Sequence, residues 1–597
     1  MVNSMDRQPL YYTILILSIL IASSFYLSWS VDRGMGEISV ERLTIERAPG
    51  HNIELLVYSP RSANHYEPMP VVLTIHGLTG SKEGLYAFNI ELARRNFTVV
   101  SLDLPGHGDS SLEFDITDYN GMAQDAYAAI RHVQTTFTNV DNESYGVLTH
   151  SLGFRVAIEL QDFSITPRAY VAVGDVGKIA EGNYVDFPEN LLFAMGSLDE
   201  IVTRDDALKA LRNATGIETA VAGITYGSLD SQSAHRLVFS PSNHAFEVVD
   251  KILVSEAVSW LVQGVQGEDQ LTYTRDPTSQ VFFSKNVASI SAPIFIFASV
   301  IPIMLLAYSF IPEKQKPRRI KNNNRPYDIR RTFEVSSLLG GATILIFNVA
   351  LVVGISLEDS GILWLNLMSG TGLVLFLICG AIGLLFILRL LLGQNDIRFS
   401  LSSVGVERLS IEYHVRDLIK NLFVVGVGIV WLLFWLKLAE SSETQPAIFL
   451  ILIKWPTGIR WTGTFILAAL AIPFFLAEAT WIRSMLQSTC AMIGQPPIEY
   501  SWSSSYRKTV ALFLTIFLKF AMVAIYTIIA LFVTTSVGIT GGRIILIGVI
   551  WIRILIVQLL ATIIIVWTSF EFENTWSGVI MSSFILALVV VTAMPLM

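Results

Sequence analysis

The stretch YGVLTHSLGFRV, residues 145–156, combines an apolar run with a serine at position 151 and a glycine two positions later. The apolar, β-branched run predicts a buried strand, and the residues after Ser151 predict a helix. A serine between a strand and a helix is typical of a nucleophile elbow, a strained turn that presents the hydroxyl group. Such a turn needs small residues two positions to either side, a condition that Gly153 meets and Thr149 meets only loosely. The stretch therefore predicts a strand-turn-helix unit with Ser151 at its tip.

Similar short apolar runs recur on both sides of this unit, separated by stretches with helical character. Expected strands cover residues 53–59, 71–77, 97–103, 145–150, 169–174, 191–196 and 236–240. Expected helices cover residues 84–95, 120–138, 152–163, 205–212 and 245–263. Because strands that alternate with helices form parallel sheets, the pattern predicts an α/β fold, a mostly parallel twisted sheet with helices on both faces. In such sheets functional groups gather at the carboxyl ends of the strands.

The composition of the chain differs from that of a soluble protein. Hydrophobic residues make up 52% of the 597 residues and charged residues only 15%, whereas soluble proteins carry about 25% charged residues. The apolar excess begins near Ala292, while residues 32–290 have the composition of a globular domain. The only cysteines, Cys379 and Cys490, lie in the apolar half, so the globular segment has neither disulfides nor thiolate metal ligands. The net charge of −9 gives no reason to expect a nucleic acid as a partner.

Long uncharged stretches divide the chain into three expected parts. Residues 1–31 form an N-terminal transmembrane anchor or, alternatively, a signal peptide, because the uncharged stretch from Leu10 to Val31 is long enough to cross a bilayer. Residues 32–290 form the globular domain, and residues 291–597 form an all-α polytopic membrane domain of about eight helices. The spans expected after the anchor cover residues 292–311, 333–357, 361–392, 421–439, 463–482, 509–533, 543–568 and 577–597.

The charges of the loops predict an orientation in the cell membrane. The loop 313–331 holds eight Lys and Arg residues, which predicts a cytoplasmic location by the positive-inside rule. The loops 357–361 and 440–446 contain no Lys or Arg and fit the opposite side. The domain 32–290 is therefore expected to lie outside the cytoplasm. The stretch 447–461 is short and interrupted by charges and a proline, which predicts a re-entrant or interfacial helix.

Motifs around the predicted elbow resemble those of a known superfamily. His76 and Gly77 match an HG loop, GHGDS at 106–110 matches a GHG-x-S turn, and HSLG at 150–153 matches an H-S-x-G elbow. Over about residues 40–265 the chain resembles the α/β-hydrolase superfamily. The likeness is greatest to its branch of serine aminopeptidase-like, monoacylglycerol-lipase-like and acyl-thioester-hydrolase-like esterases. The threonine at position 149 departs from the glycine of the family, and the membrane region is outside the resemblance.

The resemblance implies a catalytic triad of Ser151, Asp199 and His244, in the chain order serine, acid, histidine. Asp199 follows the last strand but one, where the family places its acid, and Asp175 after the preceding strand is the alternative. His244 follows the last strand, as the catalytic histidine of the family does. His235 lies at the other end of that strand, and a five-residue strand spans about 16 Å. Only one of the two histidines can therefore reach Ser151.

The family also implies an oxyanion hole, formed by the backbone N–H groups of Leu78 and Leu152. No cofactor is expected. A metal site is not expected either, because the histidines of the globular domain show no HExxH or comparable spacing. A serine at the start of a helix often serves as a helix cap, which is the structural alternative for Ser151.

Three charged residues of the membrane half need an explanation of their own. Lys519 and Arg553 lie deep in expected spans, and Glu478 lies near the end of another. A charge in the middle of a bilayer costs about 2.5–3.5 kcal/mol, so it is normally paired or functional. These residues are therefore expected to line a polar pathway or a lipid-headgroup pocket, or else to form buried structural pairs.

The function that the sequence favours is that of a membrane-anchored serine hydrolase. It would act outside the cytoplasm on an ester, thioester or amide through an acyl-enzyme intermediate. Its expected partners are membrane lipids and a small-molecule, lipid or peptide substrate. Two alternatives remain open, a transport or lipid-handling protein with a hydrolase-like outer domain, and a catalytically silent binding domain, which Thr149 would reflect.

Overall fold

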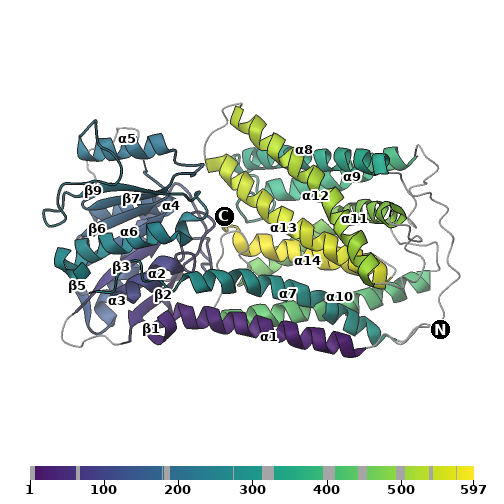
Figure 1. The fold of residues 1–597 in the computed structure, drawn as a ribbon, viewed down its shortest axis with the longest axis horizontal. Helices are drawn as coiled ribbons and strands as arrows, with labels where there is room; N and C mark the ends of the chain where they lie inside the picture. Colours follow the sequence, from purple (N-terminus) through teal and green to yellow (C-terminus); the bar gives the residue numbers. More distant parts are fainter. Residues whose placement is uncertain are drawn as a thin grey trace. The chain divides into compact units, whose positions relative to one another are not determined.

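The computed structural model describes residues 7–61, 68–177, 179, 188–272, 274–311, 329–393, 411–441, 454–492, 505–536, 542–572 and 575–597. The chain divides into two compact units (Figure 1). The sheet unit is Ala22–Pro293 with Ala439–Leu452 and Ala593–Met597, and the helical unit is Met1–Ile21, Ile294–Leu438 and Ile453–Thr592.

A nine-stranded sheet forms the centre of the sheet unit, in the order β1-β2-β4-β3-β5-β6-β7-β9-β8. The strands are β1 (Ile38–Ala48), β2 (His51–Pro60), β3 (Met69–Ile75), β4 (Thr98–Leu102), β5 (Val140–His150), β6 (Ala169–Val173), β7 (Leu191–Gly196), β8 (Thr225–Tyr226) and β9 (His235–Ser240). The six strands from β4 to β9 in this order pair in parallel, while β2 and β8 pair antiparallel to their neighbours. The predicted mostly parallel sheet is confirmed.

Two strands, β1 and β8, were not among the expected ones. β1 pairs only with β2, as one arm of an antiparallel hairpin at the edge of the sheet. Most of its side chains are exposed or half-buried, and Glu41, Arg42 and Glu46 occur along it. An edge strand can keep charged side chains in water, so it lacks the continuous apolar run that identifies a central strand. β8 has only two residues and carries no pattern at all.

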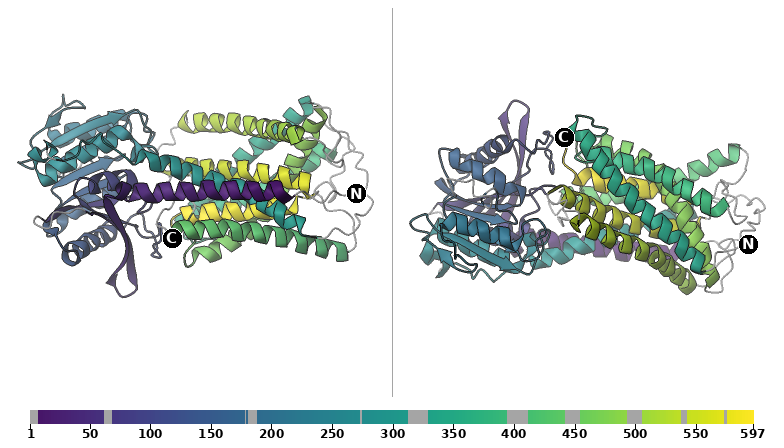
Figure 2. Two further views of the ribbon diagram at one scale, coloured as in Figure 1. Left: turned by 60° about the horizontal axis from the view of Figure 1, so that its bottom comes forward. Right: turned by 90° about the horizontal axis from the view of Figure 1, so that it is seen from above.

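Helices cover both faces of the sheet (Figure 2). They are α2 (Tyr86–Ala93), α3 (Tyr119–Thr136), α4 (Leu152–Ile158), α5 (Arg204–Thr215) and α6 (Lys251–Leu261). The connection through α2 runs from β3 to one neighbour and the connection through α3 returns past β3 to the other, so right-handed crossovers place α2 and α3 on opposite faces. α2 and α6 pack on each other and share one buried apolar core with the strands. Because these strands run parallel, the carboxyl ends of β3, β5, β7 and β9 lie along one edge of the sheet.

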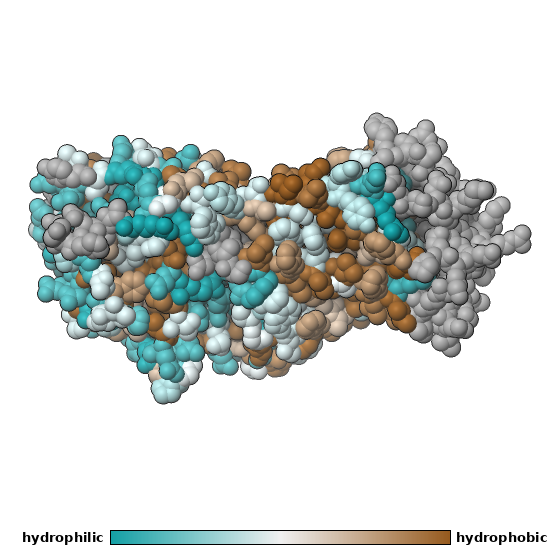
Figure 3. All heavy atoms as spheres, turned by 90° about the horizontal axis from the view of Figure 1, so that it is seen from below, coloured by the Kyte–Doolittle hydropathy of each residue, from teal (hydrophilic) through white to brown (hydrophobic). Residues whose placement is uncertain are grey.

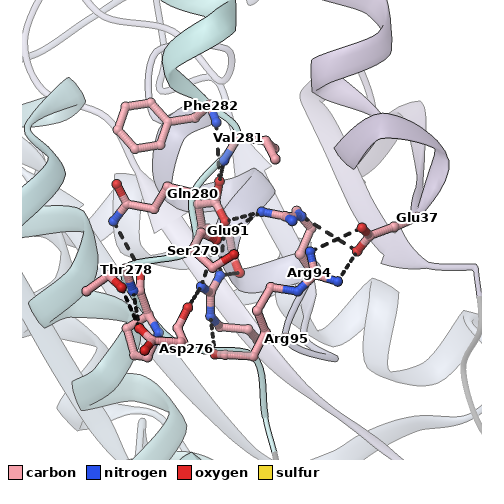
Figure 4. Close-up of polar contacts among 12 residues, drawn as sticks. Glu37, Glu91, Arg94, Arg95, Asp276, Thr278, Ser279, Gln280, Val281 and Phe282 are labelled. Atoms are coloured by element: carbon pink, nitrogen blue, oxygen red, sulfur yellow. Dashed lines mark hydrogen bonds and ion pairs between the residues drawn. The ribbon is translucent and has the colours of Figure 1, made fainter.

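The segment that follows α6 is bound back onto α2 (Figure 4). The buried carboxylate of Glu91 accepts hydrogen bonds from the backbone N–H groups of Val281 at 2.6 Å and Phe282 at 3.3 Å. Arg95, which lies just past the C-terminal end of α2, pairs with Glu91 at 3.0 Å and donates to the carbonyl oxygen of Ser279 at 3.2 Å. These charge-assisted bonds hold the end of the sheet unit against α2.

The sheet unit begins and ends on neighbouring helices. α1 (Arg7–Asp32) leads into it and α7 (Phe283–Ser309) leads out of it. Lys285 of α7 forms an ion pair with Asp32 of α1, and both side chains are buried. The two points at which the chain enters and leaves the unit therefore lie side by side.

Nine helices in the described part of the chain are long and apolar enough to cross a membrane. Besides α1 and α7 they are α8 (Ile329–Asp359), α9 (Gly370–Gly393), α10 (Ile411–Ser441), α11 (Arg460–Met492), α12 (Ser505–Ser536), α13 (Gly542–Glu571) and α14 (Trp576–Ala593). Each of the nine expected spans overlaps one of them, as a multi-pass membrane protein requires. The loop 313–331 lies outside the described residues except for 329–331, which begin α8. Of the stretch 447–461, residues 454–461 are described: residues 454–459 form no helix and α11 begins at Arg460, so this described part contains no separate interfacial helix.

Large apolar side chains cover the outer faces of these helices (Figure 3). Those that are more than half exposed include Leu345, Val349, Ile382, Phe386, Val430, Phe513, Phe517 and Ile528. Soluble proteins rarely expose apolar surface on this scale, whereas lipid-facing helices need it.

The interior of the helical unit contains an ion pair. Lys519 of α12 pairs with Glu478 of α11 and donates a hydrogen bond to Thr562 of α13 at 3.2 Å. All three side chains are buried, as is Arg553 of α13. Pairing reduces the free energy needed to bury a charge among apolar helices. The pair therefore corresponds to the structural alternative that the sequence left open for Lys519 and Glu478.

Candidate active site

Ser151 lies at the carboxyl end of β5 with a strained backbone, at φ 50° and ψ −124°. A positive φ is uncommon for a residue with a Cβ atom and costs about 1–3 kcal/mol. The side chain makes no capping hydrogen bond to α4, so the alternative role of Ser151 as a helix cap is wrong. The Ser151 N–H donates to the carbonyl oxygen of Val173 at 2.8 Å, which ties the turn to β6. The strain is thus held in place by the sheet while the hydroxyl group has no part in capping.

Gly153 lets the start of α4 approach β3 closely. A Cβ atom at this position would collide with the carbonyl oxygens of Ile75 and His76. We expect Gly153→Ala to reduce the free energy of unfolding by about 1–3 kcal/mol, because either α4 or the loop after β3 must shift. The thermal midpoint of the detergent-purified protein measures this effect. An unchanged midpoint would mean that α4 can move away from β3 freely.

Thr149, the residue that departs from the pattern of an elbow, is accommodated inside the sheet. It pairs with Ile75 of β3 and Ala172 of β6, and it is buried. Its hydroxyl group donates to the carbonyl oxygen of Val171 at 3.2 Å. The turn at Ser151 keeps its strained geometry beside this threonine, so the departure does not remove the elbow.

Asp199 and His244 come together at the same edge of the sheet. The Nδ1 atom of His244 lies 3.0 Å from the Oδ2 atom of Asp199, and both side chains are almost fully buried. The other oxygen of Asp199 accepts hydrogen bonds from the N–H groups of Ile201 at 2.6 Å and Val202 at 3.1 Å. Three N–H groups thus stabilise the ionised carboxylate, which in turn fixes the proton of His244 on Nδ1 and leaves Nε2 as an acceptor.

Asp175, the alternative acid, and His235, the alternative histidine, make contacts elsewhere in the sheet unit. Asp175 accepts hydrogen bonds from the N–H groups of Val176 at 2.7 Å and Gly177 at 2.8 Å, and it pairs with Arg155 at 3.2 Å. His235 lies at the opposite end of β9, where its Nδ1 atom contacts the carbonyl oxygen of Ser233 at 3.1 Å. Neither is bonded to the Asp199–His244 pair.

A second buried acid, Glu247, borders this pair. It follows His244 by one helical turn, and its Oε2 atom lies 3.8 Å from His244 Nδ1 and 3.9 Å from Nε2 of His150. Burial and the neighbouring Asp199 carboxylate raise the pKa of Glu247 to about 10. Burial, and then the nearby His244, lower the pKa of His150 well below its usual value, so this imidazole is neutral at pH 7. The sequence reading missed Glu247, although a Glu three residues after the expected histidine was visible.

The loop after β3 passes directly beside Ser151. A Cβ atom at Gly77 would lie 2.9 Å from the Cβ atom of Ser151 and 2.9 Å from Nδ1 of His150. The next residue is Leu78, and Leu152 opens α4 on the other side of Ser151. The same loop lines a cavity of about 40 Å³ that includes His150 and Leu78. The backbone N–H groups expected to form an oxyanion hole thus belong to the segments that flank Ser151.

A buried lysine ties the loops of this edge together. Lys82, which is fully buried, pairs with Asp103 after β4 at 2.5 Å and with Asp109 of the GHGDS turn at 2.5 Å. Its backbone N–H also donates to Asp103 at 2.7 Å. Burial lowers the pKa of Lys82, but the carboxylates of Asp103, Glu83 and Asp109 outweigh this effect and hold the pKa above its usual value. The loop that carries Leu78 is therefore fixed by charge at its far end.

Among the described residues, His150, His244 and Glu247 place possible metal-ligand atoms within 4.8 Å of one another. However, Nδ1 of His244 faces Asp199, and Nε2 of His150 faces the carbonyl oxygen of His244 at 3.2 Å. Both contacts require a proton on the nitrogen atom, so these two imidazole nitrogens act as hydrogen-bond donors. A cation could enter only by displacing these protons.

Comparison with known proteins supports the fold. Residues 66–164 match the family model of serine aminopeptidase, S33. No curated protein matches the chain.

Several solved structures are similar to part of this chain. The Thermus thermophilus protein TT1662 shares 20% identity over 38% of this chain and 98% of its own, with a TM-score of 0.28. The Pyrococcus furiosus esterase Pf2001 shares 14% identity over 39% of this chain and 95% of its own, with a TM-score of 0.30. A Vigna radiata epoxide hydrolase mutant shares 19% identity over 23% of this chain, with a TM-score of 0.19, and the match spans only 39% of that enzyme.

Proposed function

We propose that this protein, whose sheet unit has the α/β-hydrolase fold, is a membrane-anchored serine hydrolase with Ser151 as its nucleophile. The observation that carries the proposal is the turn at Ser151, where a positive φ is maintained although the hydroxyl group caps nothing. Strain of this kind persists where the surrounding structure enforces it, and it collects at active sites. The bonded pair of Asp199 and His244 at the same edge of the sheet supports the proposal.

The chemistry follows from the roles of these groups. His244 Nε2 takes the proton of the Ser151 hydroxyl group while its oxygen attacks the carbonyl carbon of an ester, thioester or amide. Asp199 stabilises the imidazolium that forms. The backbone N–H groups of Leu78 and Leu152 stabilise the negative oxygen of the tetrahedral intermediate. The leaving group takes the proton from His244, and water then releases the acyl group from Ser151 by the same steps.

The sheet unit is proposed to lie outside the cytoplasm. The eight basic residues of the loop 313–331 favour a cytoplasmic location for the first loop after α7. Where the structure describes the chain, eight of the nine candidate spans, α7 to α14, follow the sheet unit, and an even number of crossings returns the chain to the side it left. Residues 593–597 do belong to the sheet unit, where Leu596 accepts a hydrogen bond from the N–H of Phe114 at 2.8 Å. Protection of residues 32–290 from protease added outside intact cells would contradict this orientation.

Covalent labelling tests the proposed reaction. A fluorophosphonate probe reacts only with activated serines, so we expect the detergent-purified protein to be labelled and the adduct to map to the peptide that contains Ser151. A parallel comparison of short-chain esters, acylglycerols, acyl-thioesters and aminoacyl amides identifies the substrate class. If the folded protein stays unlabelled while a reference esterase reacts, the sheet unit is a silent binding domain instead.

A second candidate function is lipid handling or transport by the helical unit. Two buried side chains favour it, because Oε1 of Glu478 and both amide atoms of Gln558 have no hydrogen-bond partner among the residues that the structure describes. Unsatisfied polar atoms inside an apolar bundle can receive water or a polar ligand. Lipid scrambling by the protein in vesicles, retained in a variant without Ser151, would favour this function.

A further inference from the structure

Two carboxyl groups compete for a single N–H donor at the candidate site. Oδ2 of Asp199 and Oε2 of Glu247 lie 3.0 Å and 3.8 Å from Nδ1 of His244, respectively. The side chains of both acids are fully buried. They are also in hydrogen-bonding contact with each other. Two ionised carboxylates cannot share a hydrogen bond, so one of the two acids must carry a proton.

The donors around each acid decide where the proton lies. Asp199 accepts from three N–H groups, those of Ile201, Val202 and His244. Glu247 accepts from one, the N–H of Gly196, through Oε1. Its other oxygen, Oε2, is buried and accepts from no donor among the described residues. Because N–H donors stabilise the charged form, Asp199 is the ionised acid and Glu247 is the neutral one. The free oxygen of Glu247 therefore bears a hydrogen and can donate it.

We propose that Glu247 is a positioning residue, a neutral carboxylic acid that donates a hydrogen bond to Asp199 and so orients this carboxylate toward His244. The proposal rests on the proposed function, since it gives Glu247 a part in the same proton relay. Ionisation of Glu247 removes the donated bond and places a second negative charge beside Asp199. The relay is therefore expected to lose its geometry at alkaline pH.

The neighbours of Glu247 agree with this assignment. Besides Asp199, the charged or titratable groups that face it are His244, His150 and Glu200. His150 is neutral and donates to the carbonyl oxygen of His244, so it offers no positive charge to ionise Glu247. Glu200 adds a further negative influence. The carboxylates of Asp199 and Glu200 therefore favour the neutral form of Glu247.

The substitution Glu247→Gln separates a donated hydrogen bond from a charge. The glutamine carbonyl can accept from Gly196, and its NH₂ group can donate to Asp199, as the neutral acid does. We expect Glu247→Gln to keep the rate of fluorophosphonate labelling near pH 7.5 within about threefold of wild type. Glu247→Leu should reduce it by about 10- to 100-fold through loss of positioning. Equal losses in both variants would overturn the proposal, because they would mean that Glu247 acts as a charge.

The pH profile supplies a readout that a merely structural residue would not move. Since the pKa of Glu247 is raised to about 10, wild-type labelling should decline as pH approaches that value, whereas Glu247→Gln should show no such decline. Coincident alkaline profiles of the two proteins would contradict the proposal.

The pH dependence of thermal stability tests the protonation of Glu247 without a measurement of catalysis. Burial raises the pKa of Glu247 from 4.5 to about 10, so the folded protein binds one more proton than the unfolded chain between these pH values. Stability must then fall as pH rises through this window. We expect the midpoint of wild type to fall with pH more steeply than that of Glu247→Gln. If wild type is never labelled but this difference is found, the proposed reaction fails while the neutral acid stands; parallel curves would contradict the neutral acid itself.

Discussion

Replacement of Ser151 by alanine is expected to lower kcat/KM for the best substrate by at least about 10³-fold, because the nucleophile is lost while binding and the oxyanion site remain. Fluorophosphonate labelling should disappear with it. The side chain caps no helix, so the variant should fold as wild type does. Rates on the substrate class identified by comparison of esters, thioesters and amides measure the effect.

A neighbouring serine provides the matched control for this experiment. Ser111 follows the GHGDS turn and is exposed. Ser111→Ala should leave both labelling and hydrolysis unchanged. Hydrolysis that persists at the wild-type rate in Ser151→Ala, with the protein folded, would assign the reaction to another residue.

Replacement of Lys82 by methionine is expected to have the largest effect on stability. Its ammonium group pairs with Asp103 and Asp109 at 2.5 Å each, and it is fully buried. Removal of one partner from a buried ion pair costs about 3–5 kcal/mol, because the remaining charges stay in the interior. For a unit of this size the thermal midpoint should fall by on the order of 10 °C.

A second substitution distinguishes the loss of charge balance from the loss of packing. In the double variant Lys82→Met with Asp103→Asn, one unpaired charge is neutralised, so part of the stability should return. Lys209→Met is the control, because Lys209 is exposed and its pair with Asp206 at 3.7 Å lies at the surface. If the thermal midpoint of Lys82→Met equals that of the control, the carboxylates of Asp103 and Asp109 become hydrated when Lys82 is removed.

The sequence predicted the central strands and the spans because each has a strong local signal. A buried parallel strand is an unbroken apolar run, and a span is an uncharged stretch of sufficient length. β1 lacked such a signal because it is an edge strand whose Glu41, Arg42 and Glu46 give it the composition of a loop. Its pairing with β2 depends on contacts that follow the fold rather than the local sequence.

The residues of the candidate site also differ in how clearly the local sequence indicates them. Ser151, Asp199 and His244 follow strand ends, where motifs and chain order indicate their places. Glu247 has no such motif, because its importance comes from Gly196 and Asp199, about fifty residues earlier in the chain. Contacts of this kind appear only when β7 and the turn before α6 are placed together.

The strained turn at Ser151 has a consequence for the improvement of this protein by selection. Glycine adopts a positive φ without steric strain, whereas serine does not. Replacement of Ser151 by glycine would therefore relieve backbone strain and remove the nucleophile at the same time. A selection for thermal stability alone would therefore favour variants without catalytic activity. Robustness and reactivity are opposed at this position, and any screen must reward both.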